Sequence, residues 1–130
     1  MIQLLAIWAV AFGIFLILDG LWLGLIAKKT YQNKIGHLMS EKPNWIAAIV
    51  FYILFIFGLG FFVIQPAITT QSISYAILAG LFFGAITYGT YDLTNLATLK
   101  RWPFSLTVID ILWGSVLCSL VSLFTYLILV

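Results

Sequence analysis

The sequence predicts an all-α membrane protein: a single domain, residues 1–130, built as a bundle of four transmembrane helices. Composition is the first reason. Of the 130 residues, 64% are hydrophobic and 8% are charged, so a water-soluble globule would have too few polar side chains to cover its surface. The length of the apolar stretches is the second. A helix needs about 20 apolar residues to cross the hydrocarbon, and four stretches reach that length: about residues 2–27, 45–64, 73–99 and 104–129.

The first stretch has no leading cation and is longer than the apolar part of a cleavable signal peptide, so we expect it to be retained as a helix. Prolines mark the boundaries of later helices. Pro66 is expected to end the second helix, and Pro103 to open the fourth. The links are therefore short, and consecutive helices are expected to be antiparallel neighbours.

The basic residues indicate the topology. All six lie in two links, 28–44 and 100–103, whereas the link 65–72 has none. The positive-inside rule then places both basic links in the cytoplasm and both termini on the extracytoplasmic side. Trp45 and Trp102 adjoin these links, and both fit the belt of aromatic residues at the cytoplasmic membrane surface.

The link 28–44 is the one sizeable polar segment. Tyr31, Ile35 and Leu38 recur in it at helical spacing among lysines, which favours a short helix lying on the membrane surface. An irregular, solvated loop is the equal alternative, because Gly36 and the short length both weaken a helix.

Small residues at four-residue spacing occur twice, as Gly20 with Gly24 and as Gly80 with Gly84. Such pairs let helix backbones approach closely in lipid, and we interpret them as packing positions. Four short helices bury little surface against one another, so these faces also suggest a homo-oligomer.

Three of the four acidic residues, Asp19, Asp92 and Asp110, fall inside the apolar stretches. An ionised carboxylate near the bilayer centre costs about 2.5 to 3.5 kcal/mol on insertion scales. Counted from the nearest cytoplasmic cation at roughly 1.5 Å per residue, each aspartate lies about 12 to 14 Å inward, in one common layer. Every lysine and arginine is in a link, so the carboxyl groups need another form of compensation.

Hydrogen-bond donors are dense at that level. Tyr88, Asp92 and Asn95 share one helix face. Asp19 and Asp110 open two similar segments, Asp-Gly-Leu-Trp and Asp-Ile-Leu-Trp, which would run in opposite directions across the membrane. They are either traces of an inverted repeat or a coincidence of four residues. The candidate ligand-binding or proton-handling residues are therefore Asp19, Trp22, Tyr88, Tyr91, Asp92, Thr94, Asn95, Thr107, Asp110 and Trp113.

Two segments are distinctive: Tyr-Asp-Leu-Thr-Asn at residues 91–95, and Asp-Ile-Leu-Trp-Gly at residues 110–114. Through them, and over its whole length, the chain resembles the bacterial membrane protein family named domain of unknown function 2177. The resemblance implies a bacterial inner-membrane location and four helices. It brings no activity and no catalytic residue with it.

Three classes of function fit these residues. In the first, the aspartates line a polar pocket that opens to the cytoplasm and binds, or acts as acid and base on, a small amphiphile or lipid. Its aromatic walls would be Trp22, Tyr91 and Trp113. In the second, the same carboxyl groups serve a small proton- or cation-coupled transporter, with polar side chains between Ser115 and Thr125 along its path. In the third, protonated aspartates only join the helices, and the protein is structural or assists assembly without a ligand. The sequence leaves open whether the protein is an enzyme.

Residue counts argue against several chemistries. One cysteine and one histidine are too few for a thiolate metal site or a Ser-His-Asp triad in the membrane, and neither a P-loop nor a dinucleotide fingerprint is present. We therefore expect no cofactor and no nucleic-acid partner, and membrane lipids as the surroundings. The one metal site that oxygen ligands permit is a hard cation held by Asp19, Asp92, Asp110 and Asn95.

Overall fold

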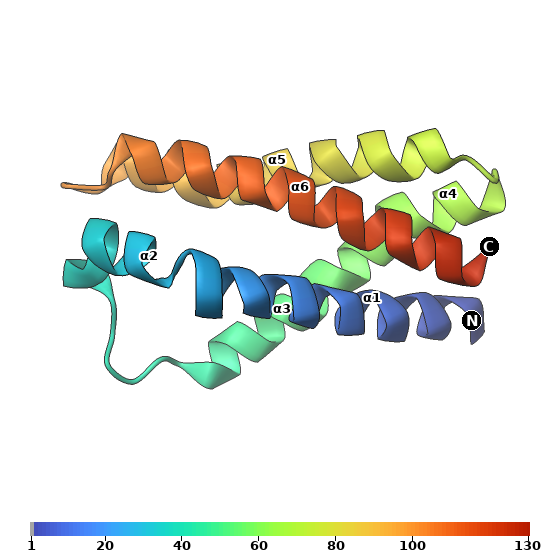
Figure 1. The fold of residues 1–130 in the computed structure, drawn as a ribbon, viewed down its shortest axis with the longest axis horizontal. Helices are drawn as coiled ribbons and strands as arrows, with labels where there is room; N and C mark the ends of the chain where they lie inside the picture. The colour runs from blue at the N-terminus through green and yellow to red at the C-terminus, as the bar shows by residue number, and fades with distance from the viewer. Residues whose placement is uncertain (1) are drawn as a thin grey trace.

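The computed structural model describes residues 2–130, and no strand occurs among them (Figure 1). Four helical spans are long and apolar enough to cross a membrane: Gln3–Ile26, Trp45–Thr69, Ile73–Thr98 and Phe104–Leu129. The predicted all-α bundle of four spans is thus confirmed. Both basic links lie at one end of the bundle, which we call the basic end, and the first and last helices start and finish at the other (Figure 1). The assignment of the basic end to the cytoplasm stays a prediction.

The first span consists of α1 (Ile2–Leu21) and a π-helical turn (Trp22–Ile26). The chain then continues as α2 (Lys28–Ile35) and a 3-10 turn (Gly36–Leu38). Most of the link is therefore helical, as the spacing of its apolar residues favoured. The π turn is closed by the N–H of Ala27, which donates to the carbonyl of Trp22 at 2.7 Å. Single π turns often occur at functional sites.

The second span runs five residues beyond the predicted 45–64, through α3 (Trp45–Leu59), a π-helical turn (Gly60–Ile64) and α4 (Gln65–Thr69). Pro66 does not end the helix. The π turn just before it has a wider hydrogen-bonding pattern, which lets the helix continue although proline has no N–H to donate. Proline has no N–H for the carbonyl of Phe62, four residues earlier. That carbonyl instead accepts the hydroxyl of Tyr75 at 3.0 Å.

The third and fourth spans, α5 (Ile73–Thr98) and α6 (Phe104–Leu129), form the most closely packed pair. Glycines permit this contact. A Cβ on Gly80 would lie 2.8 Å from the Cα of Ser119, and one on Gly84 would overlap the carbonyl of Gly114. Gly114 in turn makes room for the ring of Tyr88. The interpretation of Gly80 and Gly84 as packing positions is confirmed.

The other glycine pair behaves differently. A Cβ on Gly20 or Gly24 would meet nothing within 4 Å, so neither glycine packs against another helix of this chain. The interpretation of this pair as a packing position within the chain is wrong. The neighbouring helix α6 does not contact the glycine face of α1. It contacts α1 through the face on which Asp19 is buried. A homo-oligomer through the open face stays a prediction.

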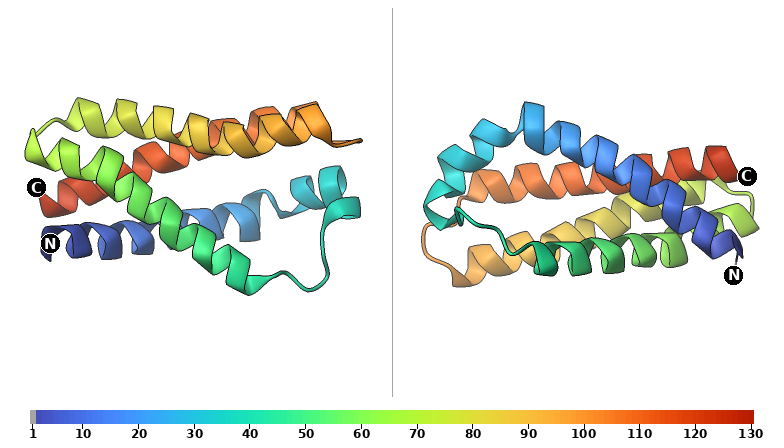
Figure 2. Two further views of the ribbon diagram at one scale, coloured as in Figure 1. Left: turned by 180° about the vertical axis from the view of Figure 1, so that it is seen from behind. Right: turned by 90° about the horizontal axis from the view of Figure 1, so that it is seen from below.

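The interior of the bundle differs between its two ends. A continuous apolar core fills the half toward the termini, and it contains Ile7, Ala11, Phe15, Phe55, Ile56, Leu59, Val63, Ile64, Ala67, Ile68, Ala76, Leu117, Cys118, Val121 and Tyr126. Toward the basic end α1 and α3 diverge from each other (Figure 2). The three buried aspartates lie in the half of the bundle where α1 and α3 diverge.

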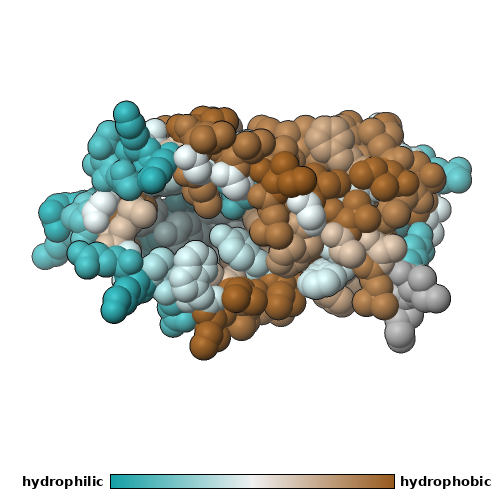
Figure 3. All heavy atoms as spheres, turned by 60° about the horizontal axis from the view of Figure 1, so that its bottom comes forward, coloured by the Kyte–Doolittle hydropathy of each residue, from teal (hydrophilic) through white to brown (hydrophobic). Residues whose placement is uncertain are grey.

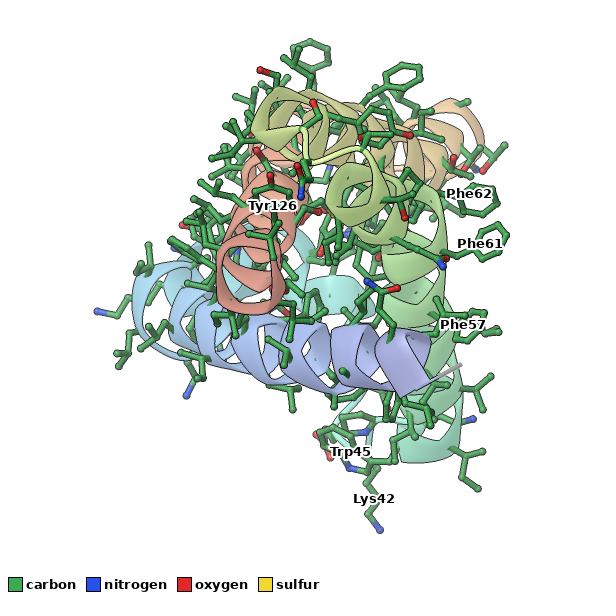
Figure 4. All side chains as sticks on the ribbon, turned by 90° about the vertical axis from the view of Figure 1, so that its right-hand side faces the viewer. Lys42, Trp45, Phe57, Phe61, Phe62 and Tyr126 are labelled. Carbon is green, nitrogen blue, oxygen red and sulfur yellow. The ribbon has the colours of Figure 1, made fainter. Side chains whose placement is uncertain are left out.

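The outer surface is apolar between the two ends. Viewed from the end that holds the termini, Phe57, Phe61 and Phe62 point away from the bundle (Figure 4), and each is more than half exposed. Large side chains directed outward in this way suit a hydrocarbon solvent. Trp45, 66% exposed near the basic end, fits the predicted aromatic belt. Trp102 does not, because it is 7% exposed and turned into the bundle.

Candidate ligand-binding cavity

A cavity of about 510 Å³ lies within the basic half of the bundle. The space-filling view shows the surface hollowed close to its hydrophilic end (Figure 3). Its walls come from α1 and the following π turn, from α2 and the link after it, and from α3, α5 and α6. The lining residues are Asp19, Leu23, Tyr31, Ile35, Met39, Ala48, Phe51, Tyr52, Thr87, Tyr88, Tyr91, Asp92, Trp102, Leu106, Asp110 and Trp113. The volume is in the range typical of sites for small molecules.

The three aspartates within the spans meet at this cavity, although they come from three different helices. Asp92 is 0% exposed, and Asp19 and Asp110 are each 9% exposed. None of the three side chains is directed outward to the lipid. The sequence places the three aspartates at similar distances from the basic end. Because α1, α5 and α6 all start or end there, these similar distances bring the carboxyl groups to one level.

Two of the aspartates are joined across helices by indole and phenol groups. The indole N–H of Trp113 donates to Asp19 Oδ1 at 3.2 Å. On the other side, the indole N–H of Trp22 donates to the hydroxyl of Tyr31 at 3.0 Å, and that hydroxyl donates to Asp110 Oδ1 at 2.7 Å. The tryptophan of each Asp-x-x-Trp segment is therefore hydrogen-bonded toward the aspartate of the other segment. Trp113 donates directly to Asp19, and Trp22 reaches Asp110 through Tyr31.

The two indoles are also in direct contact. Trp22 and Trp113 stack face to face, with centroids 4.4 Å apart and planes 8° from parallel. Stacked aromatic pairs contribute about 0.5 to 1.5 kcal/mol beyond the area they bury. The two segments thus form one cross-linked unit that joins α1 to α6.

Tyr31 was not among the predicted site residues, because it lies in the polar link rather than in a span. Its helical spacing with Ile35 was the available signal, and both side chains line the cavity. Burial raises the pKa of the Tyr31 phenol, and its hydrogen bond to Asp110 and the nearby carboxylates raise it further, against the opposing effect of Trp22. The Nζ of Lys34 donates to Ser105 Oγ at 2.6 Å, which holds α2 against the start of α6. The link therefore covers one side of the cavity.

Asp92 has no such partner. Neither of its carboxyl oxygens accepts or donates a hydrogen bond within the described chain, although both are fully buried. Its polar neighbour is the carboxyl group of Asp110. A buried polar atom without a partner costs about 1 to 3 kcal/mol, and more when it is charged. Asp92 is therefore a fully buried acidic group in the cavity wall with unused capacity for a bound molecule.

Aromatic side chains form most of the remaining wall. Tyr91 and Trp102 meet edge to face, with centroids 5.6 Å apart. Tyr52, Tyr88 and Trp113 line the cavity and also pack on the apolar core, so they separate the cavity from the half toward the termini. The cavity has an aromatic wall and a carboxyl-bearing floor.

Six of the ten predicted residues line this cavity: Asp19, Tyr88, Tyr91, Asp92, Asp110 and Trp113. The other four do not. Trp22 lies behind Trp113, and Asn95 is one turn beyond Asp92 toward the link. Thr94 is exposed and its hydroxyl donates to carbonyl groups of its own helix, including that of Tyr91 at 3.1 Å. Thr107 accepts the indole N–H of Trp102 at 3.1 Å, so its hydroxyl positions a wall residue.

Four lining residues with polar atoms were missed: Tyr31, Tyr52, Thr87 and Trp102. Tyr52 sits in an otherwise apolar stretch, and its polar end was the one signal there. Trp102 looked like a surface residue because it adjoins Arg101. The turn there, in which Arg101 has φ 61°, directs the indole into the bundle instead.

The hard-cation interpretation finds no support in the geometry. Among residues 2–130, no three or more acidic, histidine or cysteine side chains are grouped closely enough to hold a metal ion. Asp19 is tied to Trp113 and Asp110 to Tyr31, so aromatic groups occupy the positions where further ligands would have to converge.

Fold and surface together define a multi-pass membrane protein of four helices with a cavity at one end of the bundle. More particularly, the chain belongs to the family described as a predicted membrane protein, domain of unknown function 2177, which it matches over residues 4–127. The family resemblance found in the sequence is thereby confirmed. No curated protein and no solved structure matches the chain.

Proposed function

We propose that the protein binds a small amphiphile or lipid in this cavity, which opens toward the cytoplasmic face of a bacterial inner membrane. The observation that carries the proposal is Asp92, a fully buried carboxyl group in the cavity wall with no hydrogen-bond partner. Asp19 and Asp110, by contrast, are each hydrogen-bonded to a side chain of another segment. An unpaired carboxyl group beside about 510 Å³ of space supports a site for a molecule.

The character of the wall indicates what kind of molecule fits. Aliphatic and aromatic carbon covers most of it, and the carboxyl and phenol groups lie together. Pockets of this kind bury an apolar body and use a few polar groups to fix its orientation. An amphiphile satisfies both parts, with its polar end at the aspartates and its apolar part against Phe51, Leu23 and Leu106.

The transporter alternative receives less support. The apolar core fills the half of the bundle beyond Tyr88, and the polar side chains of α6 lie within it. Ser119, for example, donates to the carbonyl of Ile77 at 3.1 Å and so joins α6 to α5. A side chain that bonds neighbouring backbone in this way serves packing, whereas the buried hydroxyls of Ser122 and Thr125 have no partner within the described chain.

Two adjacent alanines offer a matched test. Ala48 lines the cavity, whereas Ala47 on the same helix is exposed outside it. The protein would be placed in nanodiscs and titrated with a brominated decyl alcohol, which quenches tryptophan on contact. Quenching of Trp113 and Trp102 should saturate. Ala48→Phe should weaken the saturable component at least about tenfold, because the ring occupies the space of the ligand, and Ala47→Phe should leave it unchanged. Quenching that never saturates, or equal behaviour of the two variants, would overturn the proposal.

A further inference from the structure

We infer that the polar end of the bound amphiphile is an ammonium group, and that Asp92 is its principal partner. This inference rests on the proposed function and names the chemical class of the ligand. Its starting point is the unused capacity of Asp92, whose two buried oxygens have no hydrogen-bond partner within the described chain. A primary or tertiary ammonium supplies both the missing donor and a positive charge.

The set of ionisable groups around the cavity favours a cation over an anion. Three carboxyl groups line it, and none of its lining residues within the described chain is lysine, arginine or histidine. The donors that Asp19 and Asp110 receive come from the neutral side chains of Trp113 and Tyr31, which supply hydrogen bonds without compensating charge. The nearby Lys34 is tied to Ser105 instead. A bound cation would relieve the repulsion between neighbouring carboxylates, whereas a carboxylate or phosphate would add to it.

The aromatic wall favours an organic cation over a metal ion. Tyr31, Tyr88, Tyr91, Trp102 and Trp113 surround the same space as the aspartates. Ring faces attract ammonium groups, most strongly where water is excluded. A metal ion would need several converging oxygen ligands, and the aspartates are not grouped in that way. An alkyl ammonium uses the rings, the carboxyl groups and the apolar wall together.

Two sources carry this chemistry. One is a free lipophilic amine, and the other is the ethanolamine head group of a phospholipid in the surrounding membrane. In the second case the phosphate would have to enter the cavity with the ammonium, because only two carbon atoms and an oxygen separate the two groups. No lysine, arginine or histidine of the described chain lines the cavity to receive it, so the geometry favours the free amine. Both sources place an ammonium beside Asp92, so the experiment separates them through the composition of the bilayer.

The test compares three ligands of equal chain length in phosphatidylglycerol nanodiscs: brominated decylamine, the matching decyl alcohol and the matching decanoate. Saturable tryptophan quenching gives each affinity. The amine should bind at least about 30-fold more tightly than the alcohol, and the carboxylate more weakly than either. Because an anionic bilayer also concentrates amines at its surface, the deciding comparison is between variants in identical nanodiscs.

Asp92→Asn should abolish the preference for the amine over the alcohol while the alcohol still binds. Glu41→Gln is the matched control, since Glu41 is the exposed acidic residue of the link and its removal changes the net charge equally. That variant should keep the preference. The parent and Asp92→Asn are then compared in phosphatidylethanolamine nanodiscs. If amine affinity falls relative to phosphatidylglycerol in the parent but not in the variant, the ethanolamine head group is a natural occupant of the cavity. Unchanged affinity assigns a free amine.

The failures of the two proposals are distinguishable. If none of the three ligands gives saturable quenching, the cavity binds no amphiphile. If the alcohol saturates and the amine binds no better, or if Asp92→Asn keeps the preference, the cavity is a site but the ammonium assignment is overturned. Should Asp92→Asn not fold, the comparison of the three ligands on the parent protein still decides the assignment.

Discussion

Replacing Gly84 by alanine should separate α5 from α6, and the size of the effect follows from backbone positions. An added Cβ would overlap the carbonyl oxygen of Gly114 and lie 2.6 Å from its carbonyl carbon. Ordinary contacts of a Cβ begin at about 3.4 Å. The shortfall at the carbon is therefore about 0.8 Å and that at the nearer oxygen is larger, and both atoms belong to helix backbone, which cannot turn aside as a side chain does.

The helices must then move apart by a comparable distance. A gap of about 0.5 to 1 Å forfeits a quarter to a half of the dispersion energy of each contact across it. Overpacking typically costs 1 to 3 kcal/mol, and a clash of backbone with backbone belongs at the upper end, so we expect about 3 kcal/mol for Gly84→Ala. Gly20→Ala is the same chemical change at an open position. There alanine should stabilise the helix by about 0.5 kcal/mol, because it loses less backbone freedom than glycine.

Unfolding in mixed micelles of a mild detergent and dodecyl sulfate, followed by circular dichroism, would measure both free energies of unfolding. We expect Gly84→Ala to be less stable than Gly20→Ala by about 3.5 kcal/mol, the sum of the cost and the gain above. Equal stability of the two variants would refute the reasoning. A loss at Gly20 that grows with protein concentration and vanishes on dilution would instead show that the open face of α1 packs against a second copy.

Two further predictions concern single hydrogen bonds made by tyrosine hydroxyls. Tyr31→Phe leaves Asp110 without its donor and should cost about 1 to 3 kcal/mol in the same unfolding assay. The raised pKa of Tyr31 makes its contribution to stability depend on pH. That contribution is fully present below the ordinary tyrosine pKa near 10 and is lost as the pH rises through the higher pKa of the folded state. The difference in free energy of unfolding between Tyr31→Phe and the parent should therefore stay constant up to about pH 10 and then shrink. Tyr75→Phe leaves the carbonyl of Phe62 unpaired before Pro66 and should cost about 1 kcal/mol, while leaving saturable ligand quenching unchanged. A stability equal to that of the parent in either variant would contradict the corresponding hydrogen bond.

The sequence alone determined that the chain is a membrane bundle, because apolar length and the placement of charge are properties of composition and order. It also indicated that Asp19, Asp92 and Asp110 lie at one level, since helical rise converts distance along the chain into depth. Six of the ten candidate residues then line the cavity. The end of the second span could not be predicted from Pro66, because a π turn can continue a helix that a proline would otherwise end.

Only the tertiary structure decided which neighbour each side chain meets. Sequence spacing gave Asp19 and Trp22 as a pair on one helix, but the indole that bonds Asp19 comes from α6, and Trp22 reaches Asp110 through Tyr31. The rotation of each helix about its own axis fixes such partners. That rotation depends on packing, as the contrast between the close contact at Gly84 and the open face at Gly20 shows. The unpaired state of Asp92, from which the ligand proposals follow, is likewise a fact of three helices together and of no single stretch of sequence.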